Sequence, residues 1–293
     1  MVNLFFFKTF VDTAHSGSVK ASAAKNYVTQ PAVTQHIHQL EAKLECRLFE
    51  RQHKKMSLTP CGKLFLNTAE QILRAYEDSK VRLRELNQKV SGTIRIATIY
   101  SIGLYQLQSI VRKFLKKFPK IEVHLEYQPF NKIYDLLVEQ NIDFGFVAHP
   151  KKRQDIITEI FDEEELVLAQ SPEHRTLPHK KLSLRELHNA KFVTFSSGTP
   201  TREHIDHFFQ SKGIYPNVVN EYDNIETLKS AIQLGMGCSL VPKNTLSREL
   251  KDKIIETLPV EGLKLKRPLG ILLLKDKVLS QGARAFYDMI VKP

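Results

Sequence analysis

The sequence predicts a mixed α/β protein, in which a small helical region is followed by one long helix and then by alternating strands and helices. Three patterns predict this order. Over the first 60 residues, apolar side chains recur at intervals of three and four, which is typical of amphipathic helices. A heptad-like apolar repeat then continues to residue 90, and short apolar strands alternate with helical segments from residue 93 onward.

The composition is that of an ordinary folded protein with a positive charge. The 293 residues are 42% hydrophobic and 26% charged, which excludes a disordered chain and allows two or three compact units. The formal net charge is +11, and residues 1–90 hold 14 Lys/Arg against 8 Asp/Glu, a net +6. This excess favours an anionic partner, and a solvated basic surface is the plain alternative.

The cysteines predict neither a disulfide framework nor a zinc site. Cys46, Cys61 and Cys238 are scattered and form no metal-ligand spacing, so each is expected to be a small, partly buried side chain. The apolar run Leu4 to Phe7 is too short for a signal peptide, and no long uncharged apolar segment follows. We therefore expect a cytoplasmic protein that makes no use of a membrane, a metal or a cofactor.

Two helices are predicted before residue 28. The apolar stripe of the first is Leu4, Phe7, Phe10, Val11 and Ala14. The segment Ser16 to Ser18 ends this helix and caps the next one, which runs from Val19 to about Tyr27 and is rich in Ala and Ser. Such small side chains allow a third helix to approach closely, which favours a helix-turn-helix.

The third helix is predicted to begin near Thr29. Thr29 suits the N-cap position, and Pro31 suits the first turn, where no N–H is needed. Its apolar face comprises Ala32, Val33, Ile37, Leu40 and Leu44. Its opposite face lacks arginine and carries side chains able to hydrogen-bond base edges, namely Gln30, Thr34, Gln35, His38 and Gln39.

A short basic hairpin is predicted after the third helix. Leu48 and Phe49 form an apolar anchor, and the segment Glu50 to Leu58 is cationic. A helix that can read bases, followed by a hairpin that can hold phosphate, is the outline of a winged helix-turn-helix. The predicted base contacts are Thr29, Gln30, Pro31, Thr34, Gln35 and His38, and the predicted backbone contacts are Arg51, Lys54 and Lys55. Ser18 is also predicted to bind DNA.

An ordinary solvated surface is the alternative for the polar face of the third helix. His36 and His38 are expected to be surface residues or phosphate contacts rather than metal ligands, because nothing nearby in the sequence completes a metal site.

One long helix is predicted from Pro60 to about Val90. Its apolar positions are spaced alternately by four and three, at Phe65, Ala69, Ile72, Tyr76, Ser79, Leu83, Leu86 and Val90. This seam predicts a linker helix that pairs with the same helix of a second chain. The alternative is a helix that packs on its own domain.

From residue 93 the alternation predicts βαβ units and a parallel sheet. The predicted strands are residues 93–99, 121–126, 144–148, 165–169, 192–195, 218–221, 238–241 and 269–274. The predicted helices are residues 104–118, 132–139, 202–212, 225–234 and 281–291.

The sequence also resembles the LysR-type transcriptional regulators. The resemblance is carried, in matching order and spacing, by Gly17-Ser18, Ala23-Ala24, Thr29 to Val33, Ile37, Leu40-Glu41, Leu44, Leu48 to Arg51, Leu58 to Pro60 and Gly62. Members of that family usually carry a leucine at Asn26, a glycine at Glu45 and arginine among Gln35, His36 and His38. The first two departures concern local packing, and the third implies fewer charge-assisted base contacts and a larger share of affinity from the wing.

The resemblance implies three parts: a winged helix-turn-helix at 1–59, a linker and dimerisation helix at 60–91, and an effector domain at 92–293. The effector domain would have two α/β lobes of the type 2 periplasmic-binding-protein kind, lobe I at 92–162 and 269–293 and lobe II at 163–268. The resemblance further implies a homodimer, with a tetramer as the working form, on a double-stranded DNA operator. A small metabolite is the implied effector, and RNA polymerase is a possible further partner.

A ligand is expected where strands end and helices begin, because open α/β sheets bind ligands beyond the carboxyl ends of their strands. One such segment lies in each predicted lobe, at residues 98–103 and 196–202, and such positions favour a small anion. The predicted effector-binding residues are Thr98, Tyr100, Ser101, Ile102, Ala148, Ser196, Ser197, Thr199, Thr201 and Arg202.

Some of these predicted residues could have a structural role instead of binding a ligand. Thr199 and Thr201 can serve as helix caps, and Pro200 removes one N–H donor from the loop. Arg202 can form a surface salt bridge with Glu203 or Asp206.

Two rival functions differ in what they would require. An enzyme would need a motif such as GxSxG, Walker A, HExxH or a complete GxGxxG, none of which occurs. The acidic segment Asp162 to Glu165 is expected to be a solvated crossover between lobes, and His149 a solvated loop residue.

A nonspecific DNA binder would bind operator and random DNA equally. We therefore predict a sequence-specific, ligand-responsive regulator that is not an enzyme.

Overall fold

The computed structural model describes residues 3–52, 55–85, 91–178, 181–275 and 277–291, and it describes no side chain at 51, 52, 55, 78 or 81–85. The chain forms two compact units, Met1–Lys89 and Val90–Pro293, and each unit is described by itself.

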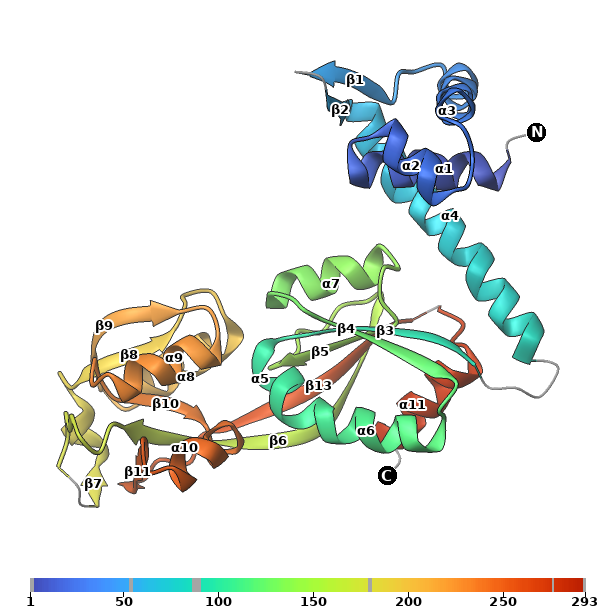
Figure 1. Cartoon of the computed structure of the whole chain (residues 1–293). Helices are drawn as coiled ribbons and strands as arrows, with labels where there is room; N and C mark the ends of the chain where they lie inside the picture. The colour runs from blue at the N-terminus through green and yellow to red at the C-terminus, as the bar shows by residue number, and fades with distance from the viewer. Residues whose placement is uncertain (1–2, 53–54, 86–90, 179–180, 276, 292–293) are drawn as a thin grey trace. The chain divides into compact units, whose positions relative to one another are not determined.

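The first unit is a winged helix-turn-helix with a long helix (Figure 1). Its elements are α1 (Leu4–Ser16), α2 (Val19–Lys25), α3 (Gln30–Leu44), the antiparallel hairpin of β1 (Phe49–Gln52) and β2 (Lys55–Leu58), and α4 (Pro60–Glu85). The core contains Phe10, Ala23, Val33, Ile37, Leu40, Leu48, Phe49 and Ala69. The predicted apolar face of α3 is buried at its centre, whereas Leu44 is exposed because it lies at the last turn.

Single residues fix the ends of these helices. Gly17 ends α1 in the left-handed region (φ 62°) and donates its N–H to the Thr13 carbonyl at 2.9 Å, a conformation that glycine adopts at little cost. Glu45 ends α3 in the same region (φ 53°), where a side chain adds strain. Glu45 therefore occupies a left-handed position that would suit the glycine expected there.

The helix α4 has two different stretches. Ala69 is buried in the core of its own unit and Phe65 packs against that core. The first turns of α4 therefore pack on their own domain, which is the alternative to pairing with a second chain. Farther along, Ile72 is 37% and Tyr76 47% exposed. Of the remaining seam, Ser79 is exposed, while the side chains of Leu83, Leu86 and Val90 lie outside the described residues.

The second unit contains two lobes, each with its own core (Figure 1). Lobe I contains β3 (Gly92–Thr98), α5 (Tyr100–Ile102), the π-helical turn η1 (Gly103–Leu107), α6 (Gln108–Lys117), β4 (Ile121–Tyr127), α7 (Phe130–Val138), β5 (Phe144–Ala148) and α11 (Gln281–Val291). β3 lies between β4 and β5 and is parallel to both. This part of the sheet is the βαβ arrangement that the alternation predicts.

Lobe II is built from shorter elements around a larger apolar cluster. Its strands are β7 (Leu182–Ser183), β8 (Lys191–Phe195), β9 (Asn217–Tyr222), β10 (Ser239–Pro242), β11 (Glu256–Leu258) and β12 (Val260–Glu261). Its helices are η2 (Leu184–Leu187), α8 (Pro200–Ser211), α9 (Ile225–Gln233), η3 (Lys243–Leu246) and α10 (Ser247–Lys251).

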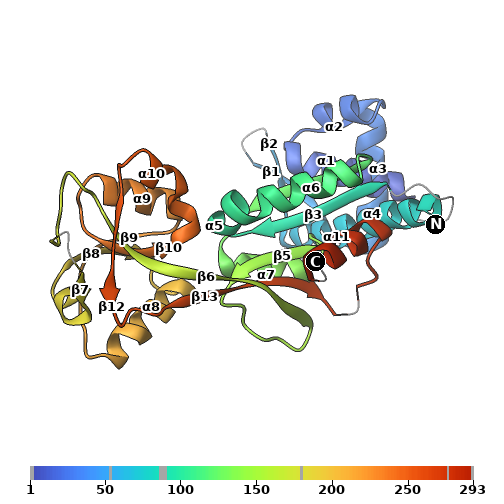
Figure 2. The same cartoon turned by 90° about the horizontal axis from the view of Figure 1, so that it is seen from below.

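Two long strands run side by side between the lobes, as both views show (Figure 2). β6 (Ile156–Gln170) and β13 (Lys266–Leu274) are antiparallel, with Ile156 opposite Leu274 and Glu165 opposite Lys266. The expectation of a parallel sheet is therefore wrong for these strands, since β13 is also antiparallel to β5. The first part of β6 carries charged side chains at exposed positions, and for this reason its sequence does not resemble an apolar strand.

Candidate functional site

The outer face of α3 forms a polar surface. Gln30, Pro31, Thr34, Gln35 and His38 are all exposed, and together with Val19, Gln39 and Ala42 they line a shallow groove. Because α3 carries its apolar residues on the opposite side, the fold directs this row of polar side chains away from the core.

Two glutamines on this surface, Gln30 and Gln35, have side-chain amides without a partner among the described residues. The hydroxyl of Thr34, by contrast, donates to the Gln30 backbone carbonyl at 3.0 Å, and Nδ1 of His38 lies 3.4 Å from Oε2 of Glu41. A glutamine amide offers one donor and one acceptor side by side, the arrangement that recognises adenine.

Two residues predicted to bind DNA act as helix caps. The hydroxyl of Ser18 accepts the N–H of Ala21 at 3.3 Å at the start of α2, and the hydroxyl of Thr29 accepts the N–H of Ala32 at 3.4 Å at the start of α3. These hydrogen bonds fix the first turn of each helix.

His36 is not the surface residue that the sequence suggests. Its ring stacks on Phe6 with centroids 4.4 Å apart, meets Phe5 edge-on, and its Nδ1 lies 3.3 Å from the Thr9 hydroxyl. Burial lowers the pKa of His36, which favours the neutral ring. His36 therefore packs α3 against α1, and a phosphate contact of this residue stays a prediction.

A polar cluster joins α1 to α2 at the position where a leucine was expected. The Asp12 carboxylate accepts from Lys25 Nζ at 2.5 Å and from Asn26 Nδ2 at 2.8 Å. Asp12 and Asn26 are both buried, so the pairing satisfies the carboxylate and the amide nitrogen, which would otherwise be costly to bury.

The wing is the β1–β2 hairpin. Arg51 lies opposite Met56 and Gln52 lies opposite Lys55 in the register. The side chains of Arg51 and Lys55, and all of Lys54, lie outside the described residues, so their phosphate contacts stay predictions.

A cavity of about 180 Å³ lies between the two lobes of the second unit. Five of the ten residues predicted for effector binding line it, namely Tyr100, Ser101, Ala148, Thr199 and Thr201. Most of the other lining residues are apolar, and none of them belongs to the ten predicted residues: Ile99, Gln128, Pro129, Phe130, Phe195, Pro200, Asp223, Asn224, Ile225 and Arg267.

Arg267 forms the floor of this cavity. The side chain is 1% exposed and its guanidinium is paired with Glu164 through Nε, at 3.0 Å, and through Nη2. It also donates to the Ser101 hydroxyl at 3.1 Å and to the Thr201 hydroxyl at 3.4 Å. One buried cation therefore contacts a hydroxyl from each lobe.

The expectation that Glu164 is solvated is wrong. It belongs to the acidic segment that was expected to be a solvated crossover, yet it is fully buried, because its position in β6 faces Arg267 of β13. The adjacent Glu163 does behave as expected, since it is exposed and pairs with Lys266 at 2.7 Å. Alternation along the strand explains the difference.

The other five predicted residues do not line the cavity, and for several the structure assigns another role. Ile102 is fully buried in the core of lobe I, and the buried Thr98 hydroxyl donates to the Ile99 carbonyl. Arg202 pairs with Asp206 at 2.8 Å and with Glu221 at 2.7 Å, the salt-bridge alternative. The remaining two are Ser196 and Ser197.

Helix starts contribute polar groups to the cavity. The continuous run α5–η1–α6 and the helix α7 begin at cavity-lining positions, and their first N–H groups have no side-chain cap among the residues that the structure describes. Thr199 caps α8 by accepting from Arg202 N–H, and Asn224 caps α9 through two N–H groups. The aromatic pair Tyr100 and Tyr127 stacks with centroids 4.9 Å apart.

His149 is also not a solvated loop residue. It sits in the left-handed region (φ 48°) and its ring lies 4.3 Å from that of His204, which belongs to lobe II. Burial, together with the nearby His204 and Arg267, lowers the pKa of His149 to about 4. The ring is therefore neutral near pH 7.

The described residues contain no group of three or more His, Cys, Asp or Glu side chains arranged to hold a metal ion. Over the same residues, none of the helices combines the length and apolar character needed to cross a membrane.

Known families and proteins match both units. The family model described as "Bacterial regulatory helix-turn-helix protein, lysR family" matches residues 5–63, and the model "LysR substrate binding domain" matches residues 87–292. The transcriptional activator CmpR of Synechocystis sp. is 29% identical over 284 residues, which is 97% of this chain and 93% of CmpR.

Solved structures share the fold. Full-length CbnR in complex with its target DNA has a TM-score of 0.79 at 23% identity and covers 98% of each chain. The CcmR regulatory domain of Synechocystis, solved in complex with 2-PG, has a TM-score of 0.62 at 24% identity and covers 69% of this chain and 96% of that domain. Because the family models match most of the chain, this protein belongs to the LysR family of transcriptional regulators.

Proposed function

We propose that this regulator binds a specific double-stranded DNA operator and that a small anionic molecule between the two lobes controls its action there. The main observation behind the proposed ligand binding is that the buried Arg267 donates hydrogen bonds to the hydroxyls of Ser101 in lobe I and Thr201 in lobe II. A molecule bound at this point contacts both lobes at once.

The DNA part rests on the α3 surface. The exposed amides of Gln30 and Gln35 suit hydrogen bonding to base edges, and the excess of positive charge in residues 1–90 suits contact with phosphate. The wing supplies Arg51, Lys54 and Lys55 to the backbone in this proposal. The match to the solved CbnR–DNA complex supports the same use of the fold.

The cavity favours a small ligand with one anionic end. The hydroxyls of Ser101 and Thr201 and the uncapped helix starts at α5 and α7 supply donors. Ile99, Phe130 and Ile225 supply an apolar wall. Because Glu164 already neutralises Arg267, the N–H and hydroxyl groups provide most of the attraction for an anion.

The exposed stretch of α4 supports a homodimer. Ile72 and Tyr76 continue the apolar seam beyond the part of α4 that packs on its own unit, and a second copy of α4 would cover them. By family resemblance, we also propose that two such dimers form a tetramer and that the tetramer contacts RNA polymerase. A ligand would change the output only by binding one arrangement of the lobes better than another.

The DNA part is tested by selection from a random-sequence DNA library with the full-length protein at physiological salt. We expect enrichment of one interrupted palindrome, because a symmetric dimer presents two copies of α3. Enrichment of no shared motif would contradict sequence-specific binding and would favour a nonspecific DNA binder.

The ligand part is tested by the thermal shift of the full-length protein with a panel of small carboxylates and phosphate esters. A compound that raises the Tm of the wild type should lose its effect in Thr201→Val. The matched control is Thr158→Val, which removes a buried hydroxyl of β6 that has no partner among the described residues. An equal Tm shift in wild type and Thr201→Val would exclude the hydroxyl from binding.

A further inference from the structure

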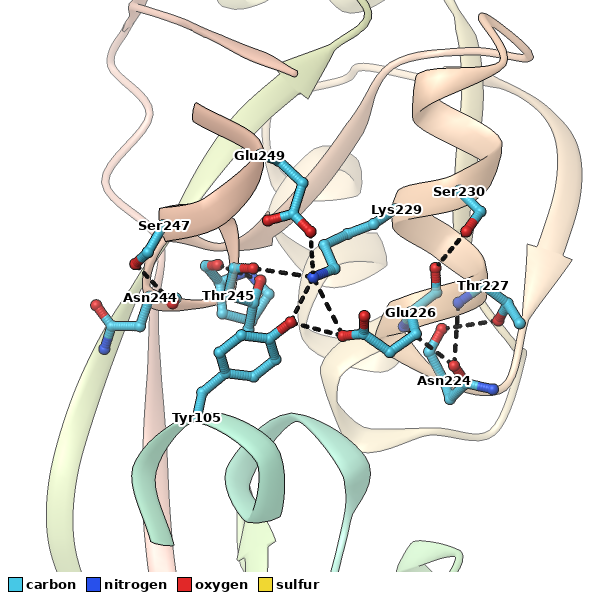
Figure 3. Close-up of polar contacts among 11 residues, drawn as sticks. Tyr105, Asn224, Glu226, Thr227, Lys229, Ser230, Asn244, Thr245, Ser247 and Glu249 are labelled. Carbon is cyan, nitrogen blue, oxygen red and sulfur yellow. Dashed lines mark hydrogen bonds and ion pairs between the residues drawn. The ribbon is translucent and has the colours of Figure 1, made fainter. Parts of the chain in front are cut away.

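A second polar contact joins the lobes (Figure 3), and its residues Tyr105, Glu226 and Lys229 do not line the cavity. Tyr105 belongs to η1 in lobe I, and its hydroxyl donates to Oε1 of Glu226, in α9 of lobe II, at 2.6 Å. The same hydroxyl accepts from Nζ of Lys229, one turn further along α9. The Tyr105 hydroxyl therefore uses both its donor and its acceptor on groups of the other lobe.

Lys229 is held in lobe II by groups of that lobe. It is 2% exposed, and its ammonium lies 2.7 Å from Glu249 Oε1, 3.1 Å from the Thr245 carbonyl and 3.1 Å from Glu226 Oε1. Burial and the hydrogen bond to Glu226 raise the pKa of Tyr105 to about 12. The hydroxyl thus keeps its proton and can donate it to Glu226 throughout the physiological range.

The contact is connected to the cavity on both sides. In lobe I, Tyr100 and Ser101 line the cavity and lie one turn before Tyr105 in the run α5–η1. In lobe II, Asn224 and Ile225 line the cavity and directly precede Glu226. A shift of either helix start against a ligand therefore moves one partner of the Tyr105 contact.

The lobes are otherwise joined by few polar contacts among the described residues. Arg267 meets Ser101 and Thr201 at the cavity floor, the exposed Lys151 lies 3.9 Å from Glu203, and the ring of His149 lies 4.3 Å from that of His204. The chain itself crosses between the lobes in β6 and β13, two adjacent strands that can bend together as a hinge.

We propose that Tyr105, Glu226 and Lys229 form a latch that holds the two lobes together and thereby sets the opening of the ligand cavity. The inference rests on the proposed function only in taking this cavity as the effector site. The π-helical turn η1 fits the role, since such turns are frequent at functional sites. Breaking the latch leaves the hinge intact and shifts the lobes toward an open arrangement.

The test measures the distance between the lobes in the full-length protein by double electron–electron resonance. Spin labels are placed on exposed positions of α7 in lobe I and α8 in lobe II, through Asp135→Cys and His207→Cys. The background carries Cys46→Ser and Cys61→Ser, while Cys238 stays because it is buried.

In this background Tyr105→Phe should give a longer and broader distance distribution, with the ratio of open to closed molecules raised about tenfold, as expected for removing hydrogen bonds to charged groups. Glu226→Gln, which keeps an acceptor but removes the charge, should give a smaller shift in the same direction. The matched control is Tyr215→Phe, an exposed tyrosine of lobe II, and it should leave the distribution unchanged.

Superimposable distributions for wild type and Tyr105→Phe would overturn the latch. The result is independent of DNA and of any effector. A shift in Tyr105→Phe together with failure of the library selection would leave the latch standing and reject the DNA part of the proposed function, and the reverse pair of results would reject only the latch.

Discussion

The α3 surface and the inter-lobe cavity differ in how the chain assembles them. The α3 surface comes from one continuous helix, so helical periodicity alone places Gln30, Thr34, Gln35 and His38 on one face. The cavity draws its lining from separate stretches of sequence scattered between Ile99 and Arg267. A local site is visible in a sequence pattern, whereas a site assembled from distant segments depends on the topology that brings them together.

The two regions also differ in whether their polar and charged side chains are exposed or buried. The α3 surface is formed by exposed polar side chains, so substitutions there should change DNA binding and leave folding unaffected. The cavity floor is the buried pair of Arg267 and Glu164, so substitution of either partner should affect folding first. This contrast is open to test by substitution in each region.

The largest effect is expected at the cavity floor. Glu164→Gln leaves the Arg267 guanidinium buried without a counter-charge, which should lower the free energy of unfolding of the second unit by about 3 kcal/mol or more. The measurement is urea denaturation of the full-length protein. The matched control is Glu163→Gln, an exposed acid on the same strand, which should cost less than about 1 kcal/mol. Equal losses in the two variants would refute the buried-pair assignment.

The next effect is expected at the exposed stretch of α4. Ile72→Glu and Tyr76→Glu place charge on the apolar seam and should weaken dimerisation by about 2 kcal/mol or more each, as for a central apolar contact. Leu83→Glu should act likewise if the seam continues. The association constant from light scattering or sedimentation is the measurement, and dimers of unchanged affinity would remove α4 from the interface.

A smaller effect is expected from His149. Its pKa of about 4 lies below the ordinary 6.5, so the unfolded chain binds more protons between these values and stability is lost as the pH falls from about 6.5 toward 4. After discounting for the partly accessible ring, the loss should be about 2 kcal/mol.

The measurement is the free energy of unfolding of wild type and His149→Asn at several pH values. Asparagine tolerates the left-handed backbone of this position, and the variant should show a flatter pH dependence in this window. The control is His188→Asn at an exposed site. Parallel pH profiles for wild type and His149→Asn would show that His149 is not the group responsible.

These residues also show what the sequence could and could not predict. Caps at Ser18 and Thr29, the buried face of α3 and the helix-turn-helix follow from short-range patterns, and the structure contains them. The alternation of strands and helices likewise locates most of the second unit.

The failures share a physical cause. Glu164 and His149 were expected to be solvated because polar residues usually are, and only the pairing of β6 with β13 and the approach of lobe II bury them. Arg267 lies 66 residues from Thr201 and 166 from Ser101 along the chain, so no local pattern could link them. The position of Ile102 inside the core depends in the same way on tertiary packing.

The most direct test of the account is the discrimination between the selected operator and a scrambled sequence, measured by fluorescence anisotropy at one fixed salt concentration. We predict that Gln30→Ala and Gln35→Ala reduce this discrimination by about 1–3 kcal/mol for each bidentate side-chain contact to a base that the substitution removes. Binding to scrambled DNA should stay unchanged. Lys54→Ala should instead weaken both complexes alike and flatten their salt dependence. Equal affinity of the wild type for the two sequences would contradict the central claim that α3 reads DNA sequence.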